Sequence, residues 1–415
     1  MLLYLTKYTV GADFGLMLHG GKFKKDFSNT IPTGAIQIPG KEYHKIRKLH
    51  NLPYRTFPPE RFRRPYESIL KEKGVKLPWK KIIPHTIYQK ELRAFVENIQ
   101  KDFSEIDLSY YQNIFKKQDL LFRSLEDATI DIEVYNRLLK EDTNLSTGAA
   151  LKTFAPIKQT HGFWKAAPVF YDRLSTVTGR LTISKGPSIL LLKKEYRKCL
   201  TSKWGKDGSI YFLDYKSLEP RLLLALKNPD IQIPKDPYLY AANSMGIGGK
   251  IDRSHIKTAI ISMIYGAGDK ELTKQLKPFI SFPEEFVASV KEQFGVEELK
   301  EKLKADYEIS KGKLIYNHYG RPIVSTSKAP YVLVNYFIQS TAVDVALFGF
   351  LKIVNKLHET GADKLISPLF VLHDALVLDV HNNVTNLLTK LTNLGSTGIP
   401  NFENIKFWLS IEKLI

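Results

Sequence analysis

The segment Ser209–Arg221 constrains the fold more than any other part of the sequence, because in it a short apolar run ends at a carboxylate. Ile210–Leu213 is rich in strand-forming residues and predicts a buried strand. Asp214 follows directly, and a helix is expected after Ser217, which is a candidate N-cap. A carboxylate at the end of a buried strand is unfavourable unless it is paired or binds a cation. The segment therefore predicts either a divalent-cation site or an ordinary strand–turn–helix unit with a solvated aspartate.

A second segment, Leu369–Val380, contains two apolar strand-like runs that flank His373 and Asp374. This pattern places an imidazole and a carboxylate at the tip of a tight hairpin. Two-residue hairpin turns normally contain glycine or Asn-Gly, so the His-Asp pair indicates a role beyond forming the turn. The alternative is that Asp374 is only a turn-forming residue.

The segment Arg253–Gly266 predicts a helix with an unusual face. Residues spaced four apart share that face, and here they are Arg253, Lys257, Ile261 and Tyr265. Two cations one turn apart suit a triphosphate, and the apolar and aromatic side chains that follow suit a base. The alternative is a surface helix with two solvated cations.

Two further segments carry weaker signals. Tyr171–Leu181 contains a glycine that permits a turn with the Arg180 cation exposed on it. A long helix predicted over residues 329–357 has Asn335 and Gln339 on one face. Buried amides on a helix either complete hydrogen bonds in the core or read base edges.

The net charge of +18 and the isoelectric point near 9.5 exceed what solubility requires and favour a polyanionic partner. Nucleic acid is the first candidate, and an anionic membrane surface is the second. Residues 1–100 contain 19 Lys and Arg against 8 Asp and Glu, so much of the excess charge lies there. Within them, residues 55–66 mix arginine with aromatic side chains. That mixture suits either nucleic-acid phosphates and stacked bases or a solvated basic surface.

The remaining composition is that of a soluble globular protein, with 415 residues of which 43% are hydrophobic and 25% charged. This length predicts two or three domains, or one domain with large insertions. No run of about eighteen apolar residues is present, so no transmembrane helix is expected. The single cysteine, Cys199, excludes an internal disulfide and a multi-cysteine zinc site and favours a reducing compartment. We interpret it as a packing residue rather than a nucleophile.

The order and spacing of these segments resemble the motifs of the family A DNA polymerases, the bacterial DNA polymerase I group. The family's motifs A (D-Y-S-x-I-E-L-R), B (R-x-x-x-K-x-x-x-[F/Y]-x-x-x-Y-G) and C (H-D-E) match Asp214–Arg221, Arg253–Gly266 and His373–Ala375. Its T-x-T-G-R-L, G-R and N-x-x-x-Q signatures match Thr176–Leu181, Gly320–Arg321 and Asn335–Gln339. The resemblance covers about residues 168–415.

The resemblance implies an α+β, right-hand polymerase fold with an antiparallel-sheet palm and helical fingers and thumb. The palm is expected at residues 166–235, with motif A, and at 327–415, with motif C. The fingers are expected at 236–326, and a thumb-like helical region at 91–165. Residues 1–90 are then a basic N-terminal region of unknown role.

The resemblance also implies roles for individual residues. Asp214 and Asp374 are expected to bind two Mg²⁺ ions, for which Mn²⁺ can substitute, and Lys257 is expected to protonate the leaving pyrophosphate. The expected dNTP-binding residues are Arg253, Lys257, Ile261, Tyr265, Glu219 and Tyr238. The expected primer–template-binding residues are Arg180, Thr178, Arg221, Arg321, Asn335, Gln339 and His373.

Several positions depart from the family pattern. Ile261 replaces an aromatic residue beside the incoming nucleotide, which affects nucleotide selection. Ala375 replaces an accessory acid after the catalytic aspartate, and Tyr238 replaces a phosphate-contacting histidine. Glu219 keeps the steric-gate position, where it would exclude a ribose 2′-hydroxyl.

The function predicted from this resemblance is DNA-templated DNA polymerisation, in which a primer 3′-hydroxyl is extended with dNTPs by a two-metal-ion mechanism. No 3′–5′ proofreading is expected. The triplet Asp131–Glu133 is similar to the start of a proofreading exonuclease, but too few residues separate it from the next motif for a nuclease domain. The alternatives are a single-subunit RNA polymerase, against which Glu219 argues, and a catalytically inactive nucleic-acid-binding module.

The expected partners are primer–template DNA, dNTPs and replication accessory proteins, with no membrane association. The compactness and divergence of the sequence favour a phage or mobile-element origin, and a cytoplasmic location in a bacterial or infected host cell. The pathway stays open between replication, gap filling and lesion bypass.

Overall fold

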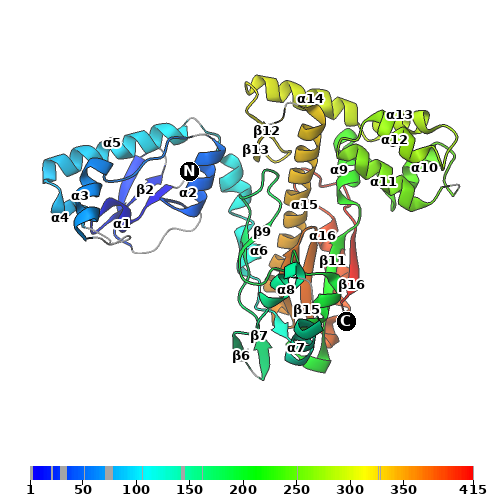
Figure 1. Ribbon diagram of the computed structural model, residues 1–415, viewed down its shortest axis with the longest axis horizontal. Coiled ribbons are helices and arrows are strands. Elements are labelled where there is room, and N and C mark those ends of the chain that lie inside the picture. Colours follow the sequence, from blue (N-terminus) through cyan, green and yellow to red (C-terminus); the bar gives the residue numbers. More distant parts are fainter. Residues whose placement is uncertain are drawn as a thin grey trace. The chain divides into compact units, whose positions relative to one another are not determined.

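The computed structural model describes residues 3–19, 22–28, 35–50, 52–70, 78–104, 106–141, 145–160, 162–249, 251–325, 327 and 329–414 (Figure 1). The chain divides into two compact units, Met1–Lys117 and Gln118–Ile415. The two units are described separately.

The first unit contains a four-stranded sheet in the order β3-β2-β1-β4. β1 pairs antiparallel with β2 and parallel with β4, so β1 lies in the interior of the sheet and all three of its residues are buried. The elements are β1 (Leu3–Leu5), α1 (Lys7–Val10), β2 (Gly15–His19), β3 (Lys22–Asp26), β4 (Ile36–Ile38), α2 (Lys41–Leu49), α3 (Glu60–Leu70), α4 (Trp79–Ile82) and α5 (His85–Ser104).

Helix α5 explains where this unit ends. Its apolar residues recur at helical spacing and form one buried stripe, and Tyr88 donates a hydrogen bond to the Val10 carbonyl at 3.0 Å. The helix runs through the boundary predicted at residue 90, which is therefore wrong, and the unit continues to Lys117. The predicted helical region 91–165 is accordingly divided between the two units.

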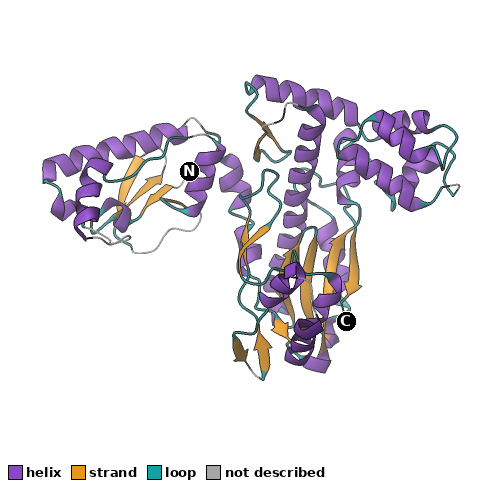
Figure 2. Cartoon of the chain, in the orientation of Figure 1, coloured by secondary structure: helices purple, strands orange, loops and turns teal. Residues whose placement is uncertain are grey.

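The second unit is built on an antiparallel sheet in the order β14-β15-β11-β16. These strands are β11 (Gly208–Tyr215), β14 (Ile366–Leu372), β15 (Ala375–His381) and β16 (Leu409–Lys413). β11 lies between β15 and β16, and its register with β15 runs from Gly208 opposite His381 to Asp214 opposite Ala375. The mixed α+β architecture with an antiparallel central sheet, predicted from the sequence, is confirmed (Figure 2).

Helix α15 (Pro330–Thr360) runs through the interior of this unit and contacts α9 (Leu218–Lys227), α14 (Val296–Ile309) and α16 (Leu387–Ser396). It is long and apolar enough to cross a membrane by those two criteria alone. However, 78% of its most apolar window is buried inside the protein, so packing accounts for its hydrophobicity. The sheet approaches it closely at Gly349, where an added Cβ would lie 1.8 Å from the Tyr215 hydroxyl.

The predicted fingers region is mainly helical. It contains α10 (Pro237–Ser244), α11 (Arg253–Ile264), α12 (Asp269–Leu276), α13 (Pro283–Gln293), α14, and the hairpin β12 (Leu314–Tyr316) and β13 (Pro322–Val324). Figure 1 shows α10 to α13 gathered in one group, and α14 contacts both α13 and α15. Asp236 forms the N-cap of α10 and Asp252 that of α11, so both helices begin where a carboxylate accepts from free backbone N–H groups.

The remaining strands and α-helices of the second unit precede β11 in the sequence. They are α6 (Asp119–Arg123), β5 (Thr129–Ile130), α7 (Ile132–Glu141), α8 (Leu145–Lys152), β6 (Lys158–Thr160), β7 (Phe163–Lys165), β8 (Phe170–Asp172), β9 (Thr182–Lys185) and β10 (Leu200–Thr201). Asp131 caps α7 by accepting from the Glu133 and Val134 amides, both at 3.0 Å. Its carboxylate therefore has a structural role at the start of this helix. Cys199 is fully buried in a hydrophobic core of the second unit. Burial raises the pKa of its thiol to about 12, as expected of a packing residue.

Candidate active site

The structure brings Asp214 and Asp374 together, although 159 residues separate them in the sequence. Asp214 lies near the end of β11, opposite Ala375 of β15, and Asp374 lies in the turn between β14 and β15. The Tyr215 amide donates to the Asp374 carbonyl at 3.1 Å, which joins the two segments at the site itself. Both aspartates line one pocket of about 640 Å³, called the aspartate pocket below.

The electrostatics of this pair suit a bound cation. Burial raises the pKa of Asp374 to about 6, and the Asp214 carboxylate acts in the same direction. Burial also raises the pKa of Asp214, while the Lys216 cation opposes that effect. It is unfavourable for two neighbouring carboxyl groups with raised pKa values to be ionised together. A divalent cation between them stabilises both carboxylates.

The donor set fits magnesium. In the part of the chain that the structure describes, no group of three or more His, Cys, Asp or Glu side chains is arranged to hold a metal. A pair of carboxylates is nevertheless sufficient, because Mg²⁺ is usually held by one or two carboxylates and completes its shell with waters and substrate phosphates. Asp214 and Asp374 would therefore supply the protein ligands.

Lys216 is a site residue that the sequence analysis missed. Its Nζ lies 3.2 Å from Oδ2 of Asp214, and its side chain is half exposed at the edge of the aspartate pocket. The family pattern has serine at this position. The sequence could have indicated this contact. Residues i and i+2 of an extended segment point to the same side, so a lysine two positions after a predicted metal ligand can pair with that carboxylate.

The face predicted for Arg253–Gly266 lies on the pocket wall. Helix α11 presents Arg253, Lys257 and Ile261 there, and Tyr265 follows at its C-cap. Arg253 donates to the Asp236 carboxylate, and its guanidinium lies 5.0 Å from the Tyr238 ring centroid. The four residues thus form the wall in the order two cations, an apolar side chain and a phenol.

Glu219 and Arg180 form a second charged contact in the same pocket. Arg180 Nη2 lies 3.3 Å from Oε1 of Glu219 and donates to the Tyr265 hydroxyl at 3.5 Å. Burial raises the pKa of Glu219, and the Arg180 cation partly offsets that effect. Arg180, which was predicted to contact the primer–template, therefore also holds the carboxylate predicted as the steric gate.

Arg221 was predicted to contact DNA, but the structure places it in the interior. Its side chain is 1% exposed, and its guanidinium donates to the carbonyls of Lys216, Pro234 and Lys235. These bonds tie the turn after Asp214 to the segment that leads into α10. The predicted DNA contact of Arg221 is wrong, because its guanidinium is occupied by these buried carbonyls. An arginine that donates to several carbonyls need not be on the surface.

Arg321 and Thr178 are buried for a related reason. Arg321 is 4% exposed, donates to the Arg173 carbonyl, and lies 4.0 Å from the Asp344 carboxylate. Gly179 passes directly over it: an added Cβ would lie 2.1 Å from the guanidinium carbon, and its φ is +75°. The glycine beside Thr178 therefore serves close packing on Arg321. The side chains of Thr178 and Arg321 are both buried, which does not support the DNA contacts predicted for them.

Three other residues that the sequence analysis singled out also line the aspartate pocket: Gln339, His373 and Ser217. Gln339 of α15 lines the pocket and donates to the amide oxygen of Asn335, which does not line it. His373 lines the pocket with a φ of +55°, and Ser217 lines it with a φ of +54°. Ser217 occupies the predicted N-cap position, but its side chain makes no capping hydrogen bond. Left-handed residues of this kind are strained and cluster at functional sites.

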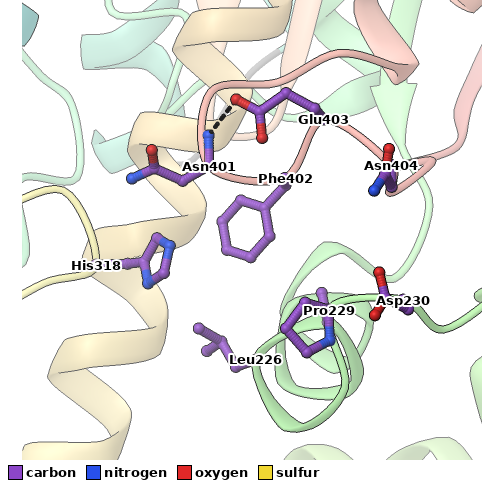
Figure 3. A pocket seen from close by; sticks show the side chains of 9 residues that line it. Leu226, Pro229, Asp230, His318, Asn401, Phe402, Glu403 and Asn404 are labelled. Carbon is purple, nitrogen blue, oxygen red and sulfur yellow. Dashed lines mark hydrogen bonds between the residues drawn. The ribbon is translucent and has the colours of Figure 1, made fainter.

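A smaller pocket of about 160 Å³ lies elsewhere in the second unit (Figure 3). The His318 and Phe402 rings stack there at 4.7 Å, and the Asn401 amide donates to Glu403 Oε1 at 3.0 Å. Its described lining residues include no lysine or arginine and share no member with the aspartate pocket. It therefore offers no lysine or arginine cation to pair with a phosphate.

Comparison with known proteins finds similarity to DNA polymerases. No protein-family model matches the chain. The DNA polymerase of Mycobacterium phage L5 is 28% identical over 220 residues, which are 50% of this chain and 34% of that protein. The chain thus spans about a third of the length of this curated relative.

Among solved structures, the POL domain of Pol1 from M. smegmatis, in complex with DNA primer-template and dNTP, superposes with a TM-score of 0.59 and 13% identity. The match covers 89% of this chain and 80% of that one. The chain therefore has the fold of this polymerase domain. Within this polymerase fold, the aspartate pocket lies where the central sheet, α11 and α15 meet.

Proposed function

We propose that this chain is a DNA-templated DNA polymerase that extends a primer 3′-hydroxyl with dNTPs. The observation that carries the proposal is the aspartate pocket, which is lined both by Asp214 and Asp374 and by the cations Arg253 and Lys257 of α11. The similarity to a phage DNA polymerase and to a polymerase domain supports it.

The reaction joins the primer to the nucleotide by one displacement at phosphorus. The primer 3′-hydroxyl loses its proton to water, its oxygen bonds to the α-phosphorus, the bond from that phosphorus to the bridging oxygen breaks, and pyrophosphate leaves. Asp214 and Asp374 would hold two Mg²⁺ ions, or Mn²⁺ in their place, and bound divalent cations lower the pKa of the 3′-hydroxyl and neutralise the phosphoryl oxygens. The chain's own contribution is to orient these groups and to place fixed cations where negative charge develops.

Arg253 and Lys257 are the residues for the triphosphate. Arg253 is held in place by Asp236 and lies over Tyr238, so its guanidinium is oriented before substrate binds. Lys257 is exposed at the pocket one helical turn later and would donate its proton to the departing pyrophosphate. Tyr238, which is buried beneath Arg253, would act on the phosphates through that guanidinium.

We assign nucleotide selection to Glu219 and to the C-terminal end of the α11 wall, where Ile261 and Tyr265 lie. Glu219 is held by Arg180 next to Tyr265 and would exclude a 2′-hydroxyl from the sugar position. Ile261 would present an apolar surface to the sugar and base, and Tyr265 would lie beside the templating base. His373, Gln339 and Asn335 would contact the primer–template.

The proposal further includes replication of phage or mobile-element DNA, without 3′–5′ proofreading, in the bacterial cytoplasm or an infected host cell. Replication accessory proteins would be partners, and no membrane is involved.

Primer extension tests the function. The wild-type protein and Asp214→Asn are incubated with a 5′-labelled primer on a DNA template, Mg²⁺, and either dNTPs or NTPs. We expect template-dependent extension with dNTPs that falls at least about 10³-fold in Asp214→Asn, since nucleotidyl transfer depends on both metal ligands. Equal extension by the variant would refute the assigned site. A preference for NTPs would favour an RNA polymerase, and duplex binding without extension would favour an inactive binding protein.

A further inference from the structure

The first unit contains a second large pocket, of about 710 Å³, called the basic pocket below. It lies between β1, α1 and the segment that precedes α3 and is lined by three cations: Lys7, Arg55 and Arg63. None of its lining residues, all of them within the described ranges, is an Asp or a Glu. This lining favours an anionic ligand. Its residues include no carboxylate that could hold a metal ion, so the lining does not suit metal-dependent hydrolysis.

Two tyrosines of the basic pocket expose more ring surface than a core residue does. Tyr8 is 51% exposed and Tyr54 is 58% exposed. Lys7 Nζ lies 5.2 Å from the Tyr8 ring centroid, the Arg47 guanidinium lies 5.3 Å from that of Tyr54, and the His44 ring stacks on Tyr54 at 5.6 Å. Both rings are thus ordered by neighbours while much of their surface faces solvent, as in a stacking platform for bases.

The charge around the pocket favours a long anion over a small one. Residues 1–100 carry 11 more positive than negative side chains, and such a field attracts polyanions over distances near the Debye length. Arg55 is held by two hydrogen bonds to Asp102, one of them 2.7 Å long, and so is fixed at the pocket wall. Cations beside aromatic faces are the features that follow a phosphate backbone and hold its unpaired bases.

We propose that the basic pocket binds single-stranded nucleic acid, with bases stacked on Tyr8 and Tyr54 and phosphates on Lys7 and Arg63. Single strands fit better than duplex, because the bases of a duplex are stacked on each other and present no free face. An acidic peptide could use the same cations and a proline-rich peptide the same rings, whereas every nucleotide of a single strand offers a phosphate and a base together. The inference concerns the first unit alone and does not depend on polymerisation.

The location of binding is tested by photocrosslinking of the full chain to oligothymidylate that carries 5-iodouracil, followed by mass spectrometry. We expect crosslinks to peptides that contain Tyr8 or Tyr54. Crosslinks confined to residues 118–415 would overturn the proposal, even if the protein binds the oligonucleotide tightly.

The energetics are tested by fluorescence anisotropy with oligothymidylate. Replacing an aromatic stacking residue weakens single-strand binding by about 1–3 kcal/mol, so Tyr54→Ala and Tyr8→Ala should each raise the Kd about 5- to 100-fold. Phe27→Ala removes an exposed ring that contacts Phe14 and does not line the pocket, and it should change the Kd less than twofold. Equal effects of Tyr54→Ala and Phe27→Ala would contradict the proposal.

Charge is tested by Lys7→Ala against Lys81→Ala, which removes an exposed cation of the same unit outside the pocket. We expect only Lys7→Ala to reduce the salt dependence of binding by about one counterion. Competition by an acidic or proline-rich peptide at equal concentration would indicate a protein ligand and refute nucleic acid. Extension of a short primed template should be unchanged in Tyr54→Ala, so failure here is distinguishable from failure of the polymerase proposal.

Discussion

Asp374→Asn should make the metal-free protein more stable while it abolishes extension. In the wild type the pKa of Asp374 is raised from its ordinary value of 3.8 to about 6 by burial and by the Asp214 carboxylate. Because the folded pKa is above the unfolded one, the folded state holds this proton more tightly. The stability that the carboxyl contributes is therefore present below about pH 4 and is lost as the pH rises through 6.

The size of the effect follows from the pKa shift. One unit corresponds to about 1.36 kcal/mol, so a rise to about 6 corresponds to at most about 3 kcal/mol above pH 7. Asp374 keeps some contact with solvent, which screens the charge. We therefore expect the amide variant to gain about 1–3 kcal/mol in free energy of unfolding at pH 7.5, and little at pH 4.

The assay is urea unfolding of both proteins in EDTA at pH 4 and pH 7.5, with Asp207→Asn as the control for an exposed carboxylate. Addition of Mg²⁺ at pH 7.5 should stabilise the wild type more than Asp374→Asn, because a ligand that binds only the folded state stabilises it. The reasoning is refuted if Asp374→Asn is no more stable than the wild type at pH 7.5 in EDTA, or if its advantage does not shrink at pH 4.

Three further predictions concern other contacts of the site. Glu219→Ala should reduce discrimination against ribonucleotides on the order of 10- to 100-fold in kcat/KM, and unchanged sugar selectivity would refute the gate. Lys216→Ser should lower the Mg²⁺ concentration for half-maximal stabilisation about two- to fivefold, the effect of losing one exposed ion pair; an unchanged Mg²⁺ titration would show that the 3.2 Å contact with Asp214 has no influence. Gly179→Ala should reduce the free energy of unfolding by about 1–3 kcal/mol through its positive φ and its clash with Arg321, and wild-type stability in urea would contradict that packing.

The aspartate pair could be predicted from the sequence because its signal is local. In Ser209–Arg221 and Leu369–Val380 the apolar runs, the turn residues and the carboxylates lie within a dozen positions. Strand pairing then fixes the distance between the aspartates, since Asp214 and Ala375 lie opposite each other on neighbouring strands. The same holds for the face of α11, which follows from helical spacing alone.

The buried arginines could not be predicted in this way. Arg221 and Arg321 are cations in segments that resemble the motifs of DNA polymerases, and the sequence shows their charge without their partners. The carbonyls that they bind belong to Pro234, Lys235 and Arg173, and that of Arg173 is 148 positions from Arg321. Only the folded chain shows that these guanidinium groups hold loops together.

The fold of the first unit could not be predicted from the sequence either. Its strands β1 and β4 have three residues each, too few for an alternating pattern to be recognised. Prolines interrupt the rest of the segment, so the sequence analysis found no domain there. The mixture of arginine and aromatic residues in 55–66 was noticed, and part of it lines the basic pocket.

Manganese binding, followed by electron paramagnetic resonance, is the most direct measurement of whether Asp214 and Asp374 together hold the ions for nucleotidyl transfer. The protein is saturated with a dideoxy-terminated primer–template and the matching dNTP, so that no turnover occurs. We expect two Mn²⁺ ions per wild-type complex beyond those bound by the nucleic acid alone, and a loss of at least one in both Asp214→Asn and Asp374→Asn. The same number of bound ions in the wild type and in both variants would contradict the assigned metal ligands.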